Sequence, residues 1–429
     1  MIHSVLIACH ALLVGLSVAP SSSAPVSLSV ELIDGTRRSG SWDGLVAGEG
    51  LRLRDGAESI VVALDDVSLI EFASGDPKAG TPRAALGLPT AQSPELPAPP
   101  TDWVLYLNDG GQITGRVSAA DQDRLTADFA FATGVVVQLE QLAAIQWARD
   151  REFKRCEDLF RASLKERLPS EDVLITRDRK DPKLLRGRLE RLTLADAAFQ
   201  FVGKSRTVQI DKLYGMVLAT GTRRPASQPA TFHFSDGSTF SGQLLGGSAA
   251  GLDIRGSFGS EVSVPIHLLR SIRVHSDRVA YLSDLSFVDE RVVGRLHRSW
   301  PVQRDRTVAG KPIVLGGRGF DKGIGCHSFT ELRFKLDGAF ETFVATIAVD
   351  ESVRPRGSVL FRVEGDGRML FDSGLVTGAT EPRDLQVAVK GVREMTLVVD
   401  YGDGLDLADH AVWAGARVLR PAKNGSGVQ

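Results

Sequence analysis

The feature that most constrains this chain is an internal repeat built on glycine spacing. Three segments contain an Asp-Gly dipeptide followed, five residues after its glycine, by a second glycine: Asp34-Gly35 with Gly40, Asp109-Gly110 with Gly115, and Asp236-Gly237 with Gly242. A fourth segment keeps Asp181 and Gly187 but has Pro182 in place of the first glycine. Thirty residues beyond the second glycine, every copy has a β-branched apolar residue: Ile70, Ile145, Val217 and Ile272. One offset shared by four copies indicates a true repeat.

Each copy predicts a small β unit. Alternating segments such as residues 104–107 and 232–234 precede the Asp-Gly turn, and this combination is typical of a β-hairpin. We therefore predict four small curled sheets of four or five strands each, over the following ranges: 26–72, 102–148, 171–218 and 230–275. The layout resembles Sm-like or SH3-like small barrels, a resemblance that transfers no binding residues. Packing or display modules without a ligand are the simpler interpretation.

The charge balance excludes some classes of partner. The chain has 51 Lys and Arg against 53 Asp and Glu, for a net charge of −2. It therefore lacks the polybasic surface that nucleic acids and anionic membranes require, and we predict no nucleic-acid partner. Sm-like folds often bind RNA, but no basic or aromatic cluster supports that function here. The 3 cysteines are too few for a disulfide scaffold or a four-thiolate metal site.

The two ends of the chain are interpreted as a targeting signal and a short tail. An apolar run at residues 5–18, followed by small residues, predicts a signal peptide over 1–24, with no membrane span in the mature chain. An uncleaved amphiphilic N-terminus is the alternative. Export would place the protein in the periplasm, the cell envelope or the extracellular space. Residues 421–429 form a short tail.

Between the repeats lie two linkers and one helix. Residues 73–101 and 219–229 contain many prolines or other turn formers and predict extended linkers. Residues 149–169 predict a single amphipathic helix. Its apolar residues recur at helical spacing: Phe153, Cys156, Phe160, Leu164 and Leu168.

From residue 279 onward the pattern changes to one larger β domain. Apolar and polar residues alternate over 331–336 and 343–349, and again around a Gly-Asp-Gly turn at 365–367. Several strands of this kind predict an antiparallel β-sandwich over 279–420, closed by a last strand around Trp413. The expected fold class is therefore all-β, with tandem small barrel-like repeats followed by a sandwich and one short amphipathic helix.

Seven ordered motifs identify a family resemblance for this region. They are Tyr281-Leu-Ser-Asp-Leu285, Ser299-Trp300 with Asp305, Lys322-Gly-Ile-Gly-Cys-His-Ser328, Phe343-Val-Ala-Thr-Ile-Ala-Val-Asp350, Gly357-Ser-Val-Leu-Phe-Arg-Val-Glu-Gly-Asp-Gly367, Leu370-Phe-Asp-Ser-Gly374 and Asp409-His-Ala-Val-Trp413. Together they resemble the NPCBM domain, which is similar to family-51 carbohydrate-binding modules. The resemblance implies a galactose-binding-like jelly roll and a glycan ligand, of galactose type. The family usually has acids where Val412 and Gly415 stand here.

A sugar site needs an aromatic surface and a few fixed polar groups. The candidate sugar-binding residues are Trp300, Arg304, Asp305, His327 and His410. Trp300 is either the aromatic platform or a packing residue. His327 either binds a hydroxyl group or satisfies a buried backbone group. Trp413 is expected in the core.

Calcium is the one candidate cofactor, and we predict that no cofactor is required. Asp406 and Asp409 lie in a segment rich in oxygen ligands that could hold calcium, or they cap turns. Known catalytic motifs are absent from the sequence, and Asp350-Glu351 is interpreted as a strand-end turn.

Three hypotheses for the function follow. The first is an exported, non-catalytic carbohydrate-binding protein whose repeats are spacers or attachment modules. The second is a structural or protein-interaction component of the envelope, with envelope proteins as partners. The third, a divergent glycoside hydrolase, rests on family association alone, because repeats occupy every stretch long enough for a catalytic barrel.

Overall fold

The computed structural model describes residues 26–46, 50–73, 103–147, 151–219, 229–294, 300–403 and 406–421. These residues form antiparallel strands almost throughout, with a single α-helix among them. The predicted all-β fold class is confirmed. The predicted signal peptide lies outside the described residues, as do nearly all of both linkers and the tail.

Each repeat is a meander of four strands whose fifth strand returns to pair with the first. A 3-10 turn precedes the fifth strand in every copy. Repeat 1 comprises β1 (Ser27–Leu32), β2 (Arg37–Val46), β3 (Gly50–Asp55), β4 (Glu58–Val62) and β5 (Val67–Phe72). Repeat 2 comprises β6 (Trp103–Leu107), β7 (Gln112–Ala120), β8 (Arg124–Phe129), β9 (Val135–Gln138) and β10 (Leu142–Gln146). Repeat 3 comprises β11 (Asp172–Thr176), β12 (Leu184–Leu192), β13 (Asp196–Phe201), β14 (Lys204–Gln209) and β15 (Leu213–Val217). Repeat 4 comprises β16 (Ala230–Phe234), β17 (Thr239–Gly247), β18 (Gly251–Gly256), β19 (Glu261–Pro265) and β20 (Leu269–Val274).

The second glycine of the repeated pattern sits where the second strand bends against the third. A Cβ atom at Gly115 would lie 2.4 Å from the carbonyl oxygen of Asp128, and one at Gly242 would lie 2.5 Å from that of Arg255. The equivalent distances at Gly40 and Gly187 are 2.9 Å and 2.0 Å, again to a carbonyl oxygen. Real Cβ atoms do not approach so closely, so only glycine fits at this bend. The first glycine is required for a different reason, since Gly35, Gly110 and Gly237 all have φ near +90° in the hairpin turn.

The β-branched residue at the end of the pattern lies in the fifth strand, where two repeats join. Ile70 in β5 faces Ile272 in β20, so that repeats 1 and 4 share a ladder. In the same way Ala144 in β10 faces Val217 in β15, joining repeats 2 and 3. These positions are apolar because they lie in buried strands that are paired on both sides.

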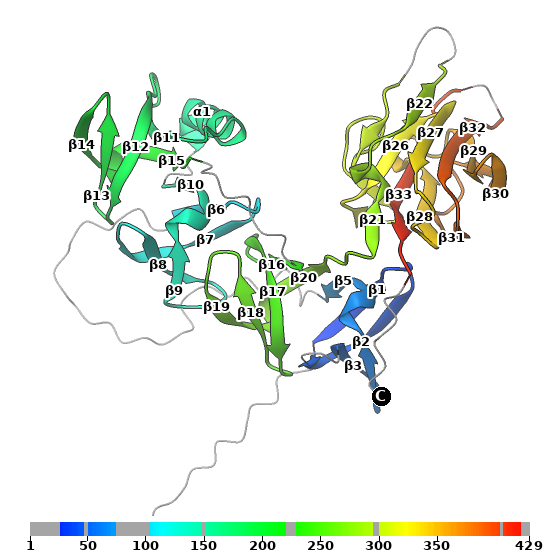
Figure 1. Ribbon diagram of the computed structural model, residues 1–429, viewed down its shortest axis with the longest axis horizontal. Helices are drawn as coiled ribbons and strands as arrows, with labels where there is room; N and C mark the ends of the chain where they lie inside the picture. The colour runs from blue at the N-terminus through cyan, green and yellow to red at the C-terminus, as the bar shows by residue number, and fades with distance from the viewer. Residues whose placement is uncertain are drawn as a thin grey trace, which may run out of the picture.

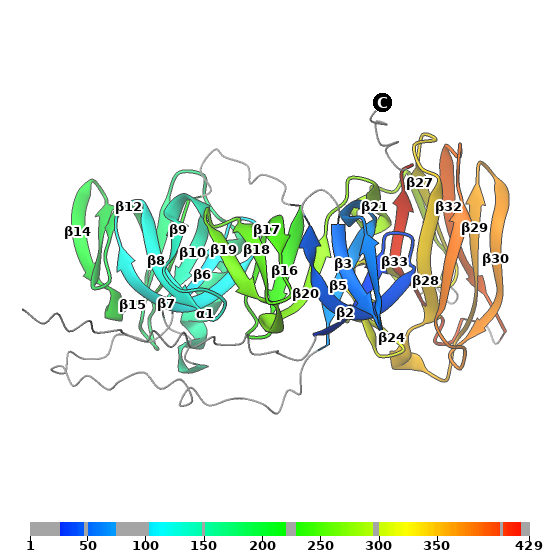
Figure 2. The ribbon, with the colours of Figure 1, turned by 90° about the horizontal axis from the view of Figure 1, so that it is seen from below.

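The repeats form a row whose order differs from their order in the chain. Repeat 4 contacts repeat 2 through Phe131, which stacks on Phe234 at 4.9 Å, and through Ser241, whose N–H donates to Asp109. The order along the row is therefore repeat 3, repeat 2, repeat 4, repeat 1 and then the sandwich (Figure 2).

The helix α1 (Lys154–Lys165) is shorter than the predicted range of 149–169. It buries Cys156 and Phe160 against repeats 2 and 3, where Tyr106 and Tyr214 cover the Phe160 ring. The predicted amphipathic character is thus confirmed, with the apolar face on the repeats. No described helix is long and apolar enough to cross a membrane.

The C-terminal region is a sandwich of two antiparallel sheets (Figure 1). One sheet has the order β23 (Gln303–Arg304), β26 (Gly323–His327), β33 (His410–Leu419), β28 (Thr342–Val349) and β31 (Arg383–Ala388), and β21 (Val279–Tyr281) also pairs with β33. The other has the order β22 (Asp289–Val292), β27 (Thr330–Lys335), β32 (Glu394–Tyr401), β29 (Ser358–Gly365) and β30 (Arg368–Thr377). A separate hairpin consists of β24 (Ile313–Leu315) and β25 (Arg318–Phe320). Trp413 is fully buried between the sheets against Phe343 and Phe361, as predicted.

Repeat 1 holds the sandwich through a buried ion pair. Arg417 in β33 pairs with Glu31 in β1 at 3.2 Å, and both side chains are less than a tenth exposed. The Arg417 guanidinium also donates to the Ile33 carbonyl at 2.8 Å, and Ile33 packs on Val344 and Leu419. A buried charge is costly without its partner, so the junction is a specific contact between the two parts.

Candidate functional site

Three of the predicted sugar-binding side chains come together at one end of the sandwich. The ring centroids of Trp300 and His327 are 5.7 Å apart and the rings are nearly parallel, at 13°. His410 completes the group at 5.4 Å from Trp300 and 5.5 Å from His327. We call these three residues the Trp–His cluster.

Strand pairing explains how the cluster forms. His327 ends β26 and His410 begins β33, and the two residues face each other in the antiparallel register. Trp300 comes from the segment before β23, which pairs with β26. Because β33 ends at Leu419 beside repeat 1, the cluster lies at the end of the sandwich away from the row of repeats (Figure 1).

Trp300 keeps an accessible aromatic surface in spite of these contacts. Its exposure is 38%, whereas the other four tryptophans of the chain are at most 5% exposed. A partly exposed indole can pack against the apolar C–H face of a sugar ring. The geometry therefore favours a platform over simple packing.

His327 satisfies a backbone group and still offers an acceptor. Its Nδ1 lies 2.8 Å from the Ser328 carbonyl oxygen. Because a carbonyl only accepts, Nδ1 carries the proton, and Nε2 of the neutral ring is then an acceptor. The structure contains the buried backbone contact expected from the sequence, whereas hydroxyl binding stays a prediction.

His410 is held in its neutral form. Burial lowers the pKa of His410, and the nearby His327 and Arg356 lower it further, while Asp350 opposes them. His410 Nδ1 and Asp350 Oδ2 are buried without a hydrogen-bond partner among the described residues. Asp350, which caps the 3-10 turn after β28 as predicted, thus also places a carboxylate near the cluster.

Asp409, one of the two candidate calcium ligands, has a structural role. It is 1% exposed, and its two oxygens accept hydrogen bonds from Ser328 Oγ at 2.6 Å and Ser358 N at 2.8 Å. Its carboxylate therefore joins the end of β26 to the start of β29 beside the cluster. Within the described ranges, no group of three or more His, Cys, Asp or Glu side chains could hold a metal ion.

Arg304 and Asp305 do not belong to the cluster. The Arg304 guanidinium lies 4.1 Å from the Phe287 ring and donates to the carbonyl oxygens of Ser283 and Leu285. Asp305 pairs with Lys322, just before the opposite end of β26 from His327. Closeness to Trp300 in sequence suggested a shared site, but the turn at β23 directs these side chains to the junction side.

Two positions that depart from the family pattern have structural reasons to lack an acid. Val412 is fully buried and packs with Ile313 and Leu315 of the β24–β25 hairpin. Gly415 has φ +58° and donates its N–H to the Lys322 carbonyl. The absence of acids at these positions matches a covered apolar layer.

Sequence reasoning missed Ser328 and the role of Asp350. Ser328 follows His327 directly. Its carbonyl oxygen accepts a hydrogen bond from the His327 imidazole, and its hydroxyl group donates one to Asp409. The only signal was its place in the motif that ends at residue 328. The two described cysteines, Cys156 and Cys326, are buried and free.

Comparison with known proteins identifies this region. Residues 278–419 match the model of the NPCBM/NEW2 domain. This part of the chain is an NPCBM domain. The predicted resemblance is confirmed, and the Trp–His cluster lies within the matched residues.

Several known proteins are similar to parts of this chain. The "Putative endo-alpha-N-acetylgalactosaminidase" of Renibacterium salmoninarum is 27% identical over 146 residues, which cover 32% of this chain and only 9% of that protein. The CBM51 of Clostridium perfringens GH95, solved in complex with methyl-galactose, is 29% identical and matches with a TM-score of 0.30, covering 33% of this chain and 99% of that one. The tandem CBM51 modules of a family 98 glycoside hydrolase from Streptococcus pneumoniae are 15% identical, with a TM-score of 0.30 over 74% of this chain and 88% of that one.

Proposed function

We propose that the protein is an exported, non-catalytic carbohydrate-binding protein that holds a glycan at the Trp–His cluster. The observation that carries the proposal is the convergence of Trp300, His327 and His410 at the far end of an NPCBM domain. The similarity of this domain to carbohydrate-binding modules supports glycan binding as its general role.

The cluster supplies the groups that a sugar requires. The exposed surface of Trp300 would pack against ring C–H groups, while His327 Nε2 would accept a hydroxyl proton. His410, kept neutral by burial, adds a second ring nitrogen without introducing charge. A polar site with one aromatic surface suits a hydroxyl-rich sugar, and the family resemblance favours one of galactose type.

The row of repeats would act as a spacer or attachment module. The sandwich joins the row at repeat 1, and the cluster points away from that junction. An attached row would therefore present the glycan site outward. Attachment to other envelope proteins through the repeats is compatible with this arrangement.

A glycan array tests the proposal. The full chain and its Trp300→Ala variant are applied to an array rich in galactose- and N-acetylgalactosamine-terminated glycans, with and without chelator. We expect selective binding by the natural chain, loss in the variant, no dependence on calcium and no release of sugar from the bound glycans. A flat array, together with stable capture of an envelope protein that sugars do not compete away, would instead support the protein-interaction role.

A further inference from the structure

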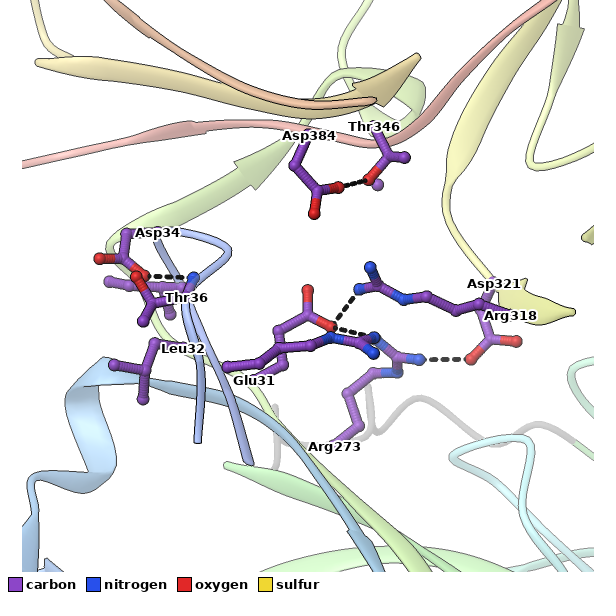
Figure 3. A network of polar contacts seen from close by, with 12 residues as sticks. Glu31, Leu32, Asp34, Thr36, Arg273, Arg318, Asp321, Thr346 and Asp384 are labelled. Atoms are coloured by element: carbon purple, nitrogen blue, oxygen red, sulfur yellow. Dashed lines mark hydrogen bonds and ion pairs between the residues drawn. The ribbon is translucent and has the colours of Figure 1, made fainter. Parts of the chain in front are cut away.

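A second pocket lies where repeat 1 meets the NPCBM domain. It has a volume of about 300 Å³, at the lower end of the range for small-molecule sites. The turn between β1 and β2 forms one wall, with Asp34 and Thr36, and strands β25, β28 and β31 form the other. Figure 3 shows Asp384 and Thr346 across from Glu31 and Arg318, with Asp34 and Thr36 at the side. We call it the junction pocket.

The floor of the junction pocket is rigid. Glu31 is 8% exposed and receives the guanidinium groups of Arg318 and Arg417. The Arg318 guanidinium also lies 4.3 Å from the Phe320 ring. With one nitrogen on Glu31 and its plane against an aromatic ring, Arg318 keeps further N–H donors in a fixed position at the pocket.

Two carboxylates offer acceptors in the pocket. Asp384 accepts the Thr346 hydroxyl through Oδ1 at 2.5 Å, and Asp34 accepts the Thr36 N–H through Oδ1 at 2.8 Å. In both side chains Oδ2 bonds to no described residue. Each carboxylate is thus oriented by one oxygen and presents the other.

The charges of the pocket are nearly balanced. Its lining has three acids, Glu31, Asp34 and Asp384, and two arginines, Arg318 and Arg417, and Arg37 pairs with Glu31 from outside the lining. With both signs present and little excess of either, the pocket has no strong preference for an anion or a cation. The walls also contain apolar surface from Val344 and Leu385.

We propose that the junction pocket is a second carbohydrate site, which takes one neutral, hydroxyl-rich sugar unit. Hydroxyl groups of the ligand would donate to Asp384 and Asp34 and accept from Arg318, while ring C–H groups would pack on Val344. The site is separate from the Trp–His cluster, because Arg417 lies seven residues along β33 from His410, or roughly 23 Å at the usual rise per residue. The protein would then hold a glycan at both ends of the NPCBM domain.

The test uses the full chain and a panel of free sugars: galactose, N-acetylgalactosamine, glucose, N-acetylglucosamine, mannose and fucose. Calorimetry and ligand-observed NMR are run on the natural chain, on Trp300→Ala and on Thr36→Trp, whose large side chain would fill the mouth of the pocket. Asp384→Asn keeps the shape of the pocket and removes one acceptor, and Asp65→Asn, the same change at an exposed position of repeat 1 outside the pocket lining, is its matched control. Melting temperatures confirm that each variant is folded.

We expect Trp300→Ala to retain saturable binding of at least one sugar. Adding Thr36→Trp to the Trp300→Ala variant should abolish this remaining binding. Asp384→Asn should weaken this binding about tenfold, since hydrogen bonds to charged groups are the stronger kind, and Asp65→Asn should leave it unchanged. If Trp300→Ala removes all binding, or if the residual binding survives Thr36→Trp, the junction site is wrong. If Thr36→Trp alone removes all binding, the junction site stands and the proposed role of the Trp–His cluster fails.

Discussion

At the scale of single residues, Trp300 is the side chain on which the account depends. Stacking against a sugar contributes about 0.5–1.5 kcal/mol beyond the buried area, so Trp300→Ala should weaken glycan binding up to about tenfold. Because Trp300 is 38% exposed, the same change should lower the free energy of unfolding by no more than about 1 kcal/mol. Titration calorimetry and urea denaturation on one protein measure both quantities.

The control for this prediction is Trp413→Phe. Trp413 is fully buried, so shortening it should reduce stability and leave the sugar affinity of the folded protein unchanged. A loss of several kcal/mol of stability in Trp300→Ala would show that Trp300 is a packing residue and not a platform.

His410 gives a prediction about pH. Burial lowers the pKa of His410 in the folded state, whereas in the unfolded chain it should titrate near its ordinary value of about 6.5. The unfolded state therefore takes up the proton first, and the stabilising contribution is complete above that pH and is lost as the pH falls through the folded pKa. We expect His410→Asn to make the free energy of unfolding less dependent on pH between 7 and 5. Equal slopes for the two proteins in urea titrations would contradict the assignment.

At the scale of elements, the second glycine of each repeated pattern (Gly40, Gly115, Gly187 and Gly242) lets the second strand lie close against the third. Gly242→Ala would place a methyl group 2.5 Å from the Arg255 carbonyl oxygen, so the β17–β18 ladder must shift. We expect a loss of about 1–3 kcal/mol in the free energy of unfolding, measured by the midpoint of urea denaturation. Gly319→Ala, where a Cβ meets nothing within 4 Å, is the matched control and should change stability little. Similar effects of the two substitutions would mean that the glycine spacing has another cause.

Strands and turns were predictable at this scale because their signals are local. The Asp-Gly turns and the alternation over β27 depend on neighbouring residues only, and the structure contains both. The half-buried strand predicted over 343–349 is wrong in one respect, because β28 is paired on both sides inside the sheet and is buried on both faces. The pairing of Ile70 with Ile272 was not predictable, because it joins strands 202 residues apart in the chain. The ion pair of Arg417 was not predictable either. Arg417 is a charged residue in a mostly apolar last strand, but its partner Glu31 lies in another domain and no local pattern connects the two.

The candidate site shows the same division. Trp300, His327 and His410 could be selected by residue type, and the cross-strand register then brings the two histidines together. Arg304 and Asp305 were selected by closeness in sequence, which a turn makes misleading. Asp409 could be selected by residue type, but its buried contacts could not be predicted, because its partners Ser328 and Ser358 come from distant segments.

At the scale of the whole molecule, the Glu31–Arg417 pair fixes the NPCBM domain to the row. Glu31→Ala leaves Arg417 buried without its carboxylate, which typically costs about 3–5 kcal/mol. We expect calorimetry to show the sandwich and the repeats melting separately in this variant. Replacing both Glu31 and Arg417 by methionine should restore joint melting only in part, because an apolar pair can substitute for a buried ion pair, but Arg37 and Arg318 also lose their carboxylate partner.

The exposed pair Arg255–Glu261 provides the control for the junction. Both side chains are more than half exposed, so Glu261→Ala should lower the free energy of unfolding by less than about 1 kcal/mol. The number of melting transitions should stay the same. A single unchanged transition in Glu31→Ala would contradict the view that this ion pair joins the two parts.

The central claim is that a glycan covers Trp300, and tryptophan fluorescence tests it most directly. Trp300 is the one tryptophan of the chain with substantial exposure, and all five lie in described residues. Acrylamide should therefore quench a single accessible population, which is absent from a Trp300→Phe variant. The measurement is the quenching constant with and without a saturating amount of the sugar selected by the array. The account predicts that bound sugar removes the accessible population; saturable binding with unchanged quenching would contradict it.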